Sequence, residues 1–440
     1  MKTVIIFGCI IFMIVALRTC NIRTLTYITI IFIFFPIYIP FMDRDAITTG
    51  TLCTFFLYFR YLIDSLRTRT FIKEKYDYLI YLLIIFGAIS IMSSHLTGVL
   101  EQEQVGPAFR HFFGSLGALL LFLVIKNYHE DKFESNFESF PDHIEKLLSI
   151  FLFMTSFHIF ASIIVKIIPS LESAFSIFFP RNVDVLNFSY QTKGVTRIKS
   201  FVMTPESYGE FLATLSPIIL YKIFRFRNPL WLVVFFLFFL GEIFAVTRSG
   251  IILFLAGVAF LFLYHLKEKI GIILSLSYIF LTAFILILYL EPSLFGDVLL
   301  RFSFIKESHE HGGTLIDTLN RKVFIDAWDV TISNLSFFGN CLSEFNFHNL
   351  LLTTLHEKGI GGTTLFFVVL FYPMVRLVKS IRNHKLANKA LIFSCLLSMV
   401  LFFINETKYE FTRSDSYQQI CWALFGTYYL VSQQSLLQKE

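Results

Sequence analysis

Apolar runs of about 17–22 residues recur along this chain of 440 residues, with short polar segments between them. The hydrocarbon core of a bilayer is about 30 Å thick and a helix rises about 1.5 Å per residue, so each run can cross a membrane as a helix. Only 16% of the residues are charged, against about 25% in soluble domains. The sequence therefore predicts an all-α, polytopic integral membrane protein.

The apolar runs predict about 12–13 transmembrane helices. They lie near residues 3–17, 25–41, 48–64, 78–95, 108–126, 147–168, 207–223, 229–246, 249–265, 270–290, 350–375, 388–404 and 416–432. Two longer polar segments remain between them, at 169–206 and 291–349.

Lys and Arg residues gather in alternate loops, which predicts the orientation of the chain. The basic loops carry Arg18/Arg23, Arg67/Arg69/Lys73/Lys75, Lys126/Lys132, Lys222/Arg225/Arg227, Lys267/Lys269 and Arg376/Lys379/Arg382/Lys385/Lys389. The positive-inside rule places these loops in the cytoplasm, and it places both long segments and the N-terminus outside.

This topology divides the chain into five parts. They are N-terminal helices in 1–168, a first outer loop in 169–206, central helices in 207–290, a large outer loop with an amphipathic helix in 291–349, and C-terminal helices in 350–440.

Several functional classes lack their sequence signatures. No P-loop or Rossmann fingerprint occurs, which excludes an ATP-driven pump whose motor lies in this chain. The net charge of +5 is spread over short loops, so nucleic-acid binding is not expected. His309, Glu310 and His311 have no third ligand at metal-site spacing, so no metal site is expected.

A histidine stands where the large outer loop meets the next helix. His348 and Asn349 precede an apolar run, and Gly359 follows His348 by 11 residues. On a continuous helix this spacing puts His348 and Gly359 on one face, about 16 Å apart. A neutral imidazole can take a proton from a hydroxyl. A structural role for a histidine at the membrane boundary is the alternative.

Three arginines are expected at the same water boundary, namely Arg197, Arg248 and Arg321. Guanidinium groups match phosphate oxygens and stay charged at any working pH, so the three predict a diphosphate site. The simpler alternatives are headgroup anchoring for Arg248 and the solvated face of an amphipathic helix for Arg321. Glu206 opens the helix that follows Arg197.

Two carboxylates, Glu210 and Glu242, lie inside predicted spans. Acids within a membrane are costly, so these two are expected to pair with the arginines or to bind a proton. The second role keeps a proton-coupled flippase or transporter as an alternative class.

His348-Asn349 followed by Gly359 and Gly362 resembles the His-Asn-x9-Gly-x-x-Gly pattern of the bacterial O-antigen polymerase and O-antigen ligase family. The resemblance covers roughly residues 195–365. It includes three further segments: Arg321 with Trp328, Thr247-Arg248-Ser249-Gly250, and Arg197 with Phe201 and Pro205. Gly339-Asn340-Cys341 departs from the Gly-x-Gly that the family often shows, at a turn in the large loop.

The resemblance implies a GT-C-like glycosyltransferase of the bacterial inner membrane, with no metal and no cofactor. Its donor would be an undecaprenyl-diphosphate-linked oligosaccharide, used on the periplasmic face. Arg197, Arg248 and Arg321 would bind the diphosphate, and His348, with Arg321, would activate the acceptor hydroxyl. Asn349, Glu206, Gly359 and Gly362 would support the site. Implied partners are membrane lipid, a chain-length regulator and a flippase.

Two activities share these motifs. A polymerase transfers the growing glycan to a lipid-linked repeat unit, whereas a ligase transfers it to lipid A-core. Thr204-Pro205-Glu206-Ser207-Tyr208 is closer to polysaccharide polymerases, as are the chain length and the additional N-terminal span. Polymerase is therefore the favoured activity and ligase the alternative.

Overall fold

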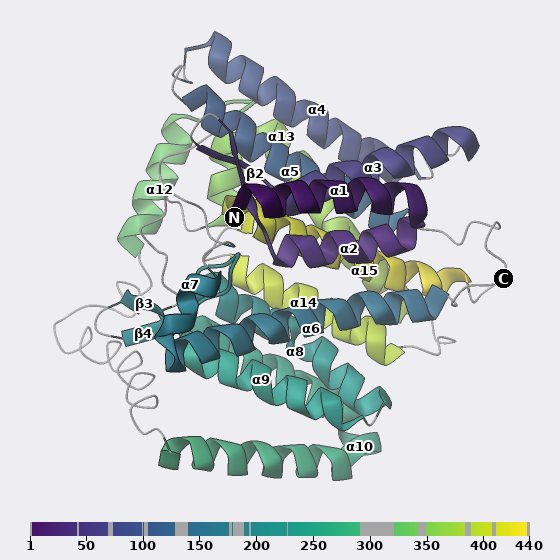
Figure 1. The fold of residues 1–440 in the computed structure, drawn as a ribbon, viewed down its shortest axis with the longest axis vertical. Coiled ribbons are helices and arrows are strands. Elements are labelled where there is room, and N and C mark those ends of the chain that lie inside the picture. Colours follow the sequence, from purple (N-terminus) through teal and green to yellow (C-terminus); the bar gives the residue numbers. More distant parts are fainter. Residues whose placement is uncertain are drawn as a thin grey trace.

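Long helices that run roughly side by side make up most of the computed structural model (Figure 1). The structure describes residues 2–41, 44–68, 74–98, 100, 104–127, 140–175, 178, 189–192, 195–226, 228–290, 321–341, 349–382, 389–406 and 411–437. The prediction of a helical, membrane-embedded protein is confirmed in this coarse form.

Most of the long helices follow the predicted spans, but the span predicted at 25–41 is too long, because the helix there ends at Phe34. The long helices are α1 (Lys2–Thr19), α2 (Ile22–Phe34), α3 (Thr49–Thr68), α4 (Lys75–Leu96), α5 (Val105–Lys126), α6 (Phe140–Ile167), α8 (Pro205–Phe226), α9 (Pro229–Ala245), α10 (Arg248–Leu290), α13 (Leu350–Ile381), α14 (Lys389–Glu406) and α15 (Asp415–Leu437). Shorter elements are η2 (Pro169–Leu171), α7 (Glu172–Phe175), α12 (Arg321–Ser333) and η4 (Phe411–Arg413).

One predicted loop is wrong. The sequence predicts a break at Lys267 and Lys269 between two spans, but the backbone is helical from Arg248 to Leu290. The physical reason is that Lys and Glu interrupt an apolar run without interrupting a helix, because both are good helix formers. The drop in hydropathy at Lys267 and Lys269 therefore predicted a loop where the helix is continuous.

Two small β-hairpins also depart from the all-α prediction. Strand β1 (Tyr38–Phe41) pairs antiparallel with β2 (Arg44–Thr48), and β3 (Ser189–Thr192) pairs antiparallel with β4 (Val195–Ile198). Figure 1 shows β3, β4, α7 and α12 at one end of the bundle, which we call the hairpin end. The C-terminus lies toward the other end, which we call the basic end because α5 and α13 finish there in Lys126 and Lys379.

Six helices among the described residues are long and apolar enough to cross a membrane. They are α4, α5, Pro141–Ile167 of α6, Arg248–His265 of α10, α13 and α14. Three shorter apolar helical stretches are Phe7–Thr19, Ile22–Phe34 and Pro229–Ala245. The larger number of 12–13 spans stays a prediction.

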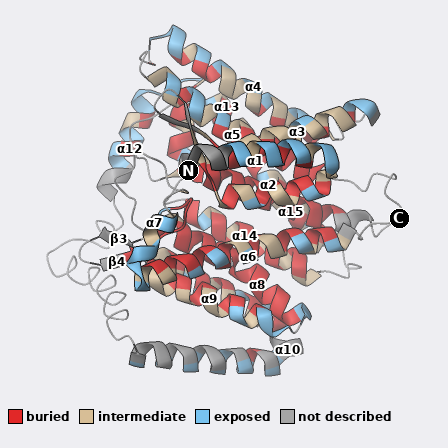
Figure 2. Ribbon diagram, in the orientation of Figure 1, coloured by how far each residue is buried: buried red, intermediate tan, exposed pale blue. Residues whose placement is uncertain are grey.

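The helices α8 and α15 carry many polar residues and are nevertheless the most enclosed. In α8, residues from Tyr208 to Phe224 are all buried, and α15 buries Trp422, Tyr428 and Tyr429 completely. Figure 2 shows buried residues along the central helices and exposed ones on α1, α4 and α12. Neighbouring helices shield the polar groups of α8 and α15 from lipid, so low hydropathy does not exclude these helices from the membrane.

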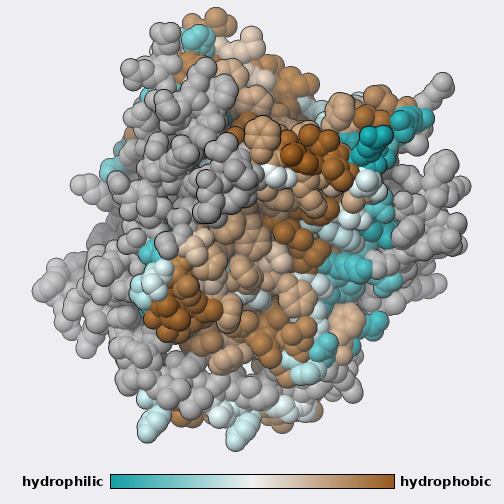
Figure 3. Space-filling view, in the orientation of Figure 1, coloured by the Kyte–Doolittle hydropathy of each residue, from teal (hydrophilic) through white to brown (hydrophobic). Residues whose placement is uncertain are grey.

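The outer surface is apolar over a broad band. On α4, Leu82, Ile85 and Met92 are exposed. Figure 3 shows hydrophobic residues across the middle of one face and hydrophilic residues toward the basic end. This distribution suits contact with lipid tails, since exposed apolar patches of this kind are rare on soluble monomers.

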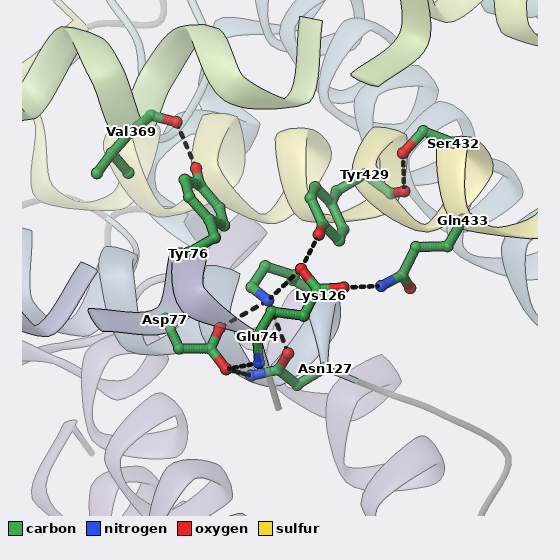
Figure 4. Close-up of polar contacts among 9 residues, drawn as sticks. All are labelled: Glu74, Tyr76, Asp77, Lys126, Asn127, Val369, Tyr429, Ser432 and Gln433. Carbon is green, nitrogen blue, oxygen red and sulfur yellow. Dashed lines mark hydrogen bonds and ion pairs between the residues drawn. The ribbon is translucent and has the colours of Figure 1, made fainter. Parts of the chain in front are cut away.

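A cluster around Lys126 joins three helices at the basic end (Figure 4). The ammonium of Lys126 lies 2.6 Å from Asp77 Oδ1, donates to Asn127 Oδ1 at 2.8 Å, and lies 3.6 Å from Glu74 Oε2. Tyr429 and Gln433 of α15 donate hydrogen bonds to the Glu74 carboxylate. Burial raises the pKa of Glu74, but Lys126 and these donors outweigh it and leave the pKa below its ordinary value.

Aromatic rings extend this Lys126 cluster to α13. The ring of Tyr76 stacks on Tyr372 with centroids 4.0 Å apart, and the Tyr76 hydroxyl donates to the Val369 carbonyl. Arg376 lies over the Tyr429 ring at 4.9 Å. The cluster therefore fixes α4, α5, α13 and α15 against one another at the basic end.

Candidate functional site

Arg197 closes the first outer loop and is buried at the hairpin end. Strand pairing sets Arg197 opposite Tyr190, and its Nε donates to the Ala245 carbonyl at 2.8 Å. Its Nη1 forms an ion pair with Glu206, which is in the first turn of α8. Two of the predicted site residues, Arg197 and Glu206, thus meet directly. Arg197 is 2% exposed, and its two contacts join β4 to α8 and to the end of α9.

Lys199 lies two residues beyond Arg197 and is also buried. Its burial lowers the pKa of the ammonium to about 8, although the charge of Glu172 opposes this shift. The backbone carbonyl of Lys199 accepts a hydrogen bond from Ser162 of α6 at 2.7 Å. This segment is therefore anchored to α6 as well as to α9.

Arg248 is the first residue of α10 and is partly exposed at the turn after α9. The turn has Val246 in the left-handed region at φ +50°, which acts as the C-cap of α9. Arg197 bonds to Ala245 within this same turn region. Two segments that the sequence singled out separately therefore converge at the hairpin end.

The acids Glu210 and Glu242 are both buried beside this turn. Glu210 accepts a hydrogen bond from Ser249 at 2.9 Å. Both oxygens of Glu242 lack a hydrogen-bond partner among the described residues. A Cβ at Gly250 would lie 2.7 Å from Glu242 Oε2, so the absence of a side chain there lets α9 and α10 meet. The expected pairing of these acids with arginines stays a prediction.

Helix α13 begins at Leu350, one residue after Asn349. The Asn349 side chain accepts a hydrogen bond from Leu352 N at 3.1 Å, which is the geometry of an N-cap. His348 lies outside the described residues. The prediction that His348 and Gly359 share one face of a continuous helix is wrong, because the helix starts after His348 and breaks at Gly359 (φ +65°, ψ −173°).

The break at Gly359 is filled by residues 336–341 of the preceding loop. Asn340 N donates to the His356 carbonyl at 2.8 Å, and Cys341 N donates to the Glu357 carbonyl at 2.9 Å. On the other side of the break, Ile360 N donates to the Ser336 carbonyl at 3.1 Å. A broken helix within a membrane leaves backbone N–H and C=O groups without hydrogen bonds. Residues 336–341 are therefore required to supply those hydrogen bonds at the break.

Glycines make that contact possible. A Cβ on Gly359 would lie 2.4 Å from Gly339 N, and Gly339 itself has φ +77°. Cys341 occupies the left-handed region at φ +53°, a conformation that favours glycine. The turn therefore forms although Cys341 stands where the family pattern often has a second glycine. Gly362 serves a different contact, since a Cβ there would lie 2.9 Å from the ring of Phe86.

Helix α12 packs on the start of α13. Ala327 of α12 and Leu352 of α13 are buried together, with Val330 packed against them. On α12, Ala327 is buried, whereas Trp328 is about half exposed. Arg321 is the first residue of α12, and its side chain lies outside what the structure describes, as do residues 291–320 with His309, Glu310 and His311.

The structure thus joins the predicted segments in two pairs at the hairpin end. The segments of Arg197 and Arg248 meet through Ala245, and the helices that begin with Arg321 and after Asn349 pack together. The sequence reasoning missed one contact: His111 Nε2 of α5 lies 3.5 Å from Glu357 Oε2 of α13. Glu357 is an acid inside a predicted span. The same criterion singled out Glu210 and Glu242, and it could have identified Glu357 as well.

Comparison with known proteins does not identify a family for this chain. No family model matches the chain, and no curated protein matches its sequence.

Proposed function

We propose that this protein is a polysaccharide polymerase of the bacterial inner membrane, acting on O-antigen or a related surface glycan. The observation that carries the proposal is the convergence of Arg197 with the turn before Arg248, at the end where α12 also lies. If the guanidinium groups of Arg197, Arg248 and Arg321 face one water boundary, they would suit a lipid diphosphate. The basic loops at the opposite end support a periplasmic position for this one.

The proposed reaction moves a glycan between two lipids. The acceptor hydroxyl oxygen attacks the anomeric carbon of the donor glycan, and the bond from that carbon to the diphosphate oxygen breaks. Undecaprenyl diphosphate leaves with the electron pair, stabilised by Arg197, Arg248 and Arg321. His348 accepts the proton of the hydroxyl. No nucleotide or metal takes part in these steps.

Alanine variants of His348 and Arg321 test this proposal. Both variants are expected to insert at normal levels and to abolish chain growth, read as the ladder on a lipopolysaccharide gel. The matched controls are His95→Ala and Arg382→Ala, which change exposed residues of the same types. Long-chain polysaccharide at normal levels in both site variants would contradict the proposal.

A deletion strain separates polymerase from ligase. Loss of a polymerase leaves one repeat unit on the lipid A-core. Loss of a ligase leaves no repeat on the core and accumulates lipid-linked polymer. Unchanged banding means that the protein is neither.

A flippase or transporter is the second candidate function, and the buried carboxylate of Glu242 favours it. Glu242 is buried among α8, α9 and α10, and its carboxylate oxygens have no hydrogen-bond partner among the described residues. A carboxyl in such a position can bind and release a proton during transport. A transporter would depend on Glu242 and tolerate the loss of His348, the reverse of the polymerase.

A further inference from the structure

A pocket lies between α4, α5, α13 and α15, beside the break in α13. Its empty volume, which includes space open to the surroundings, is about 630 Å³. The Lys126 cluster holds these same four helices at the basic end, so the pocket walls are fixed from one side. Cys341 contributes from the loop that fills the break, and burial raises the pKa of its thiol.

Polar groups from three helices converge on this pocket. Glu357 is 7% exposed, and its carboxylate lies 3.5 Å from His111 Nε2. Ser115 donates a hydrogen bond to Gln418 Oε1 at 3.1 Å. Trp422 Nε1 has no hydrogen-bond partner among the described residues. Placing a carboxylate and an imidazole inside a bundle of membrane helices is costly, which is expected where a polar ligand binds.

The remaining walls are aromatic. Phe86, Phe112, Phe366 and Trp422 line the pocket. Flat apolar rings beside a carboxylate, an imidazole and an amide suit a sugar, whose C–H faces are apolar and whose edge carries hydroxyls. An isoprenyl chain would need only apolar walls. A diphosphate would be repelled by Glu357, although Lys358 and a protonated His111 would offset part of that repulsion.

We propose that this pocket binds a sugar residue of the lipid-linked glycan, with Glu357 accepting hydrogen bonds from its hydroxyls and Trp422 against its apolar face. The inference rests on the proposed function, because it places the glycan of that reaction. The position fits: Glu357 lies eight residues after Asn349, about 12 Å along a helix from the start of α13. A lipid held at the hairpin end can therefore present its sugars to the pocket.

Competition between two lipids, measured by native mass spectrometry of the detergent-solubilised full-length protein, tests this inference. The probes are undecaprenyl diphosphate without sugars and the lipid-linked oligosaccharide extracted from cells that lack this gene. The pocket variants are Glu357→Gln, which removes the charge, and Ser115→Leu, which fills the space. Their matched controls are Asp329→Asn and Ser275→Leu, at exposed positions outside the pocket.

The unmodified protein and both controls are expected to prefer the sugar-bearing lipid. Each pocket variant should reduce that preference about tenfold or more while still binding the lipid without sugars. An unchanged preference in both pocket variants, or an equal loss of both lipids, overturns the inference and leaves the proposed function standing. If the unmodified protein binds neither lipid, the proposed function fails and the inference fails with it.

Discussion

Two buried charges, one at each end of the bundle, differ in their partners. At the basic end, Lys126 is fully buried and has Asp77, Glu74 and Asn127 as partners. At the hairpin end, Glu242 is equally buried, but neither of its oxygens has a hydrogen-bond partner among the described residues. Lys126 and Glu242 are thus buried to the same extent and differ only in their hydrogen-bonding and ionic partners.

This difference separates a structural role from a functional one. A buried charge whose partners are complete holds helices in place, and removing one partner leaves the others uncompensated. A buried polar group without a partner weakens the fold unless a proton, a water or a ligand completes it. The Lys126 cluster is therefore a fixed part of the molecule, and Glu242 is a position at the hairpin end where a proton or a ligand is expected to act.

The largest predicted effect is at the basic end. Lys126→Met leaves Asp77 buried without its cation, so we expect the folded state to lose about 3–5 kcal/mol. Thermal unfolding in detergent, followed by the loss of monomeric protein, measures this change. The double variant Lys126→Met/Asp77→Leu removes both charges and should recover part of the loss. An unfolding midpoint that does not move in the single variant would break the comparison.

The next effect is at the break in α13. Gly359→Ala places a Cβ at φ +65° and 2.4 Å from Gly339 N. We expect a loss of about 2–3 kcal/mol from backbone strain and from displacement of residues 336–341. Gly106→Ala is the matched control, because nothing lies within 4 Å of a Cβ there. If both variants unfold at the same temperature, the packing of residues 336–341 against α13 does not require a glycine at position 359.

The smallest effect is expected at Glu242. Glu242→Gln removes a carboxyl that has no described partner, so unfolding should change by less than about 1 kcal/mol. The matched variant at the basic end is Glu145→Gln, which weakens contacts to Lys222 and Tyr221 and should lower stability more. Normal chain growth in Glu242→Gln agrees with a polymerase. Loss of the polysaccharide in that variant, with His348→Ala active, would favour a transporter.

Helix positions could be predicted well from hydropathy, and the errors have local causes. The span predicted at 78–95 corresponds to α4 at Lys75–Leu96. The loop predicted at Lys267 and Lys269 failed because charged residues with high helix propensity end a hydropathy run without ending a helix. The β3–β4 hairpin was missed because four-residue strands leave almost no periodic signal.

The candidate site could be predicted only in part. Arg197 and Arg248 were each singled out as residues suited to a water boundary, and their segments do converge. The ion pair between Arg197 and Glu206 could not be predicted, since it depends on how the β3–β4 hairpin sits on α8. The roles of His348 and Arg321 stay predictions.

The sequence by itself determined where most of the long apolar helices lie, because hydropathy and helix propensity act locally along the chain. The tertiary structure decided that α13 is broken at Gly359 and completed by residues 336–341. It also decided that Lys126 meets Asp77, whereas the carboxylate oxygens of Glu242 have no hydrogen-bond partner among the described residues. These outcomes depend on which helices pack together, and side chains far apart in sequence find or miss partners only when the bundle forms.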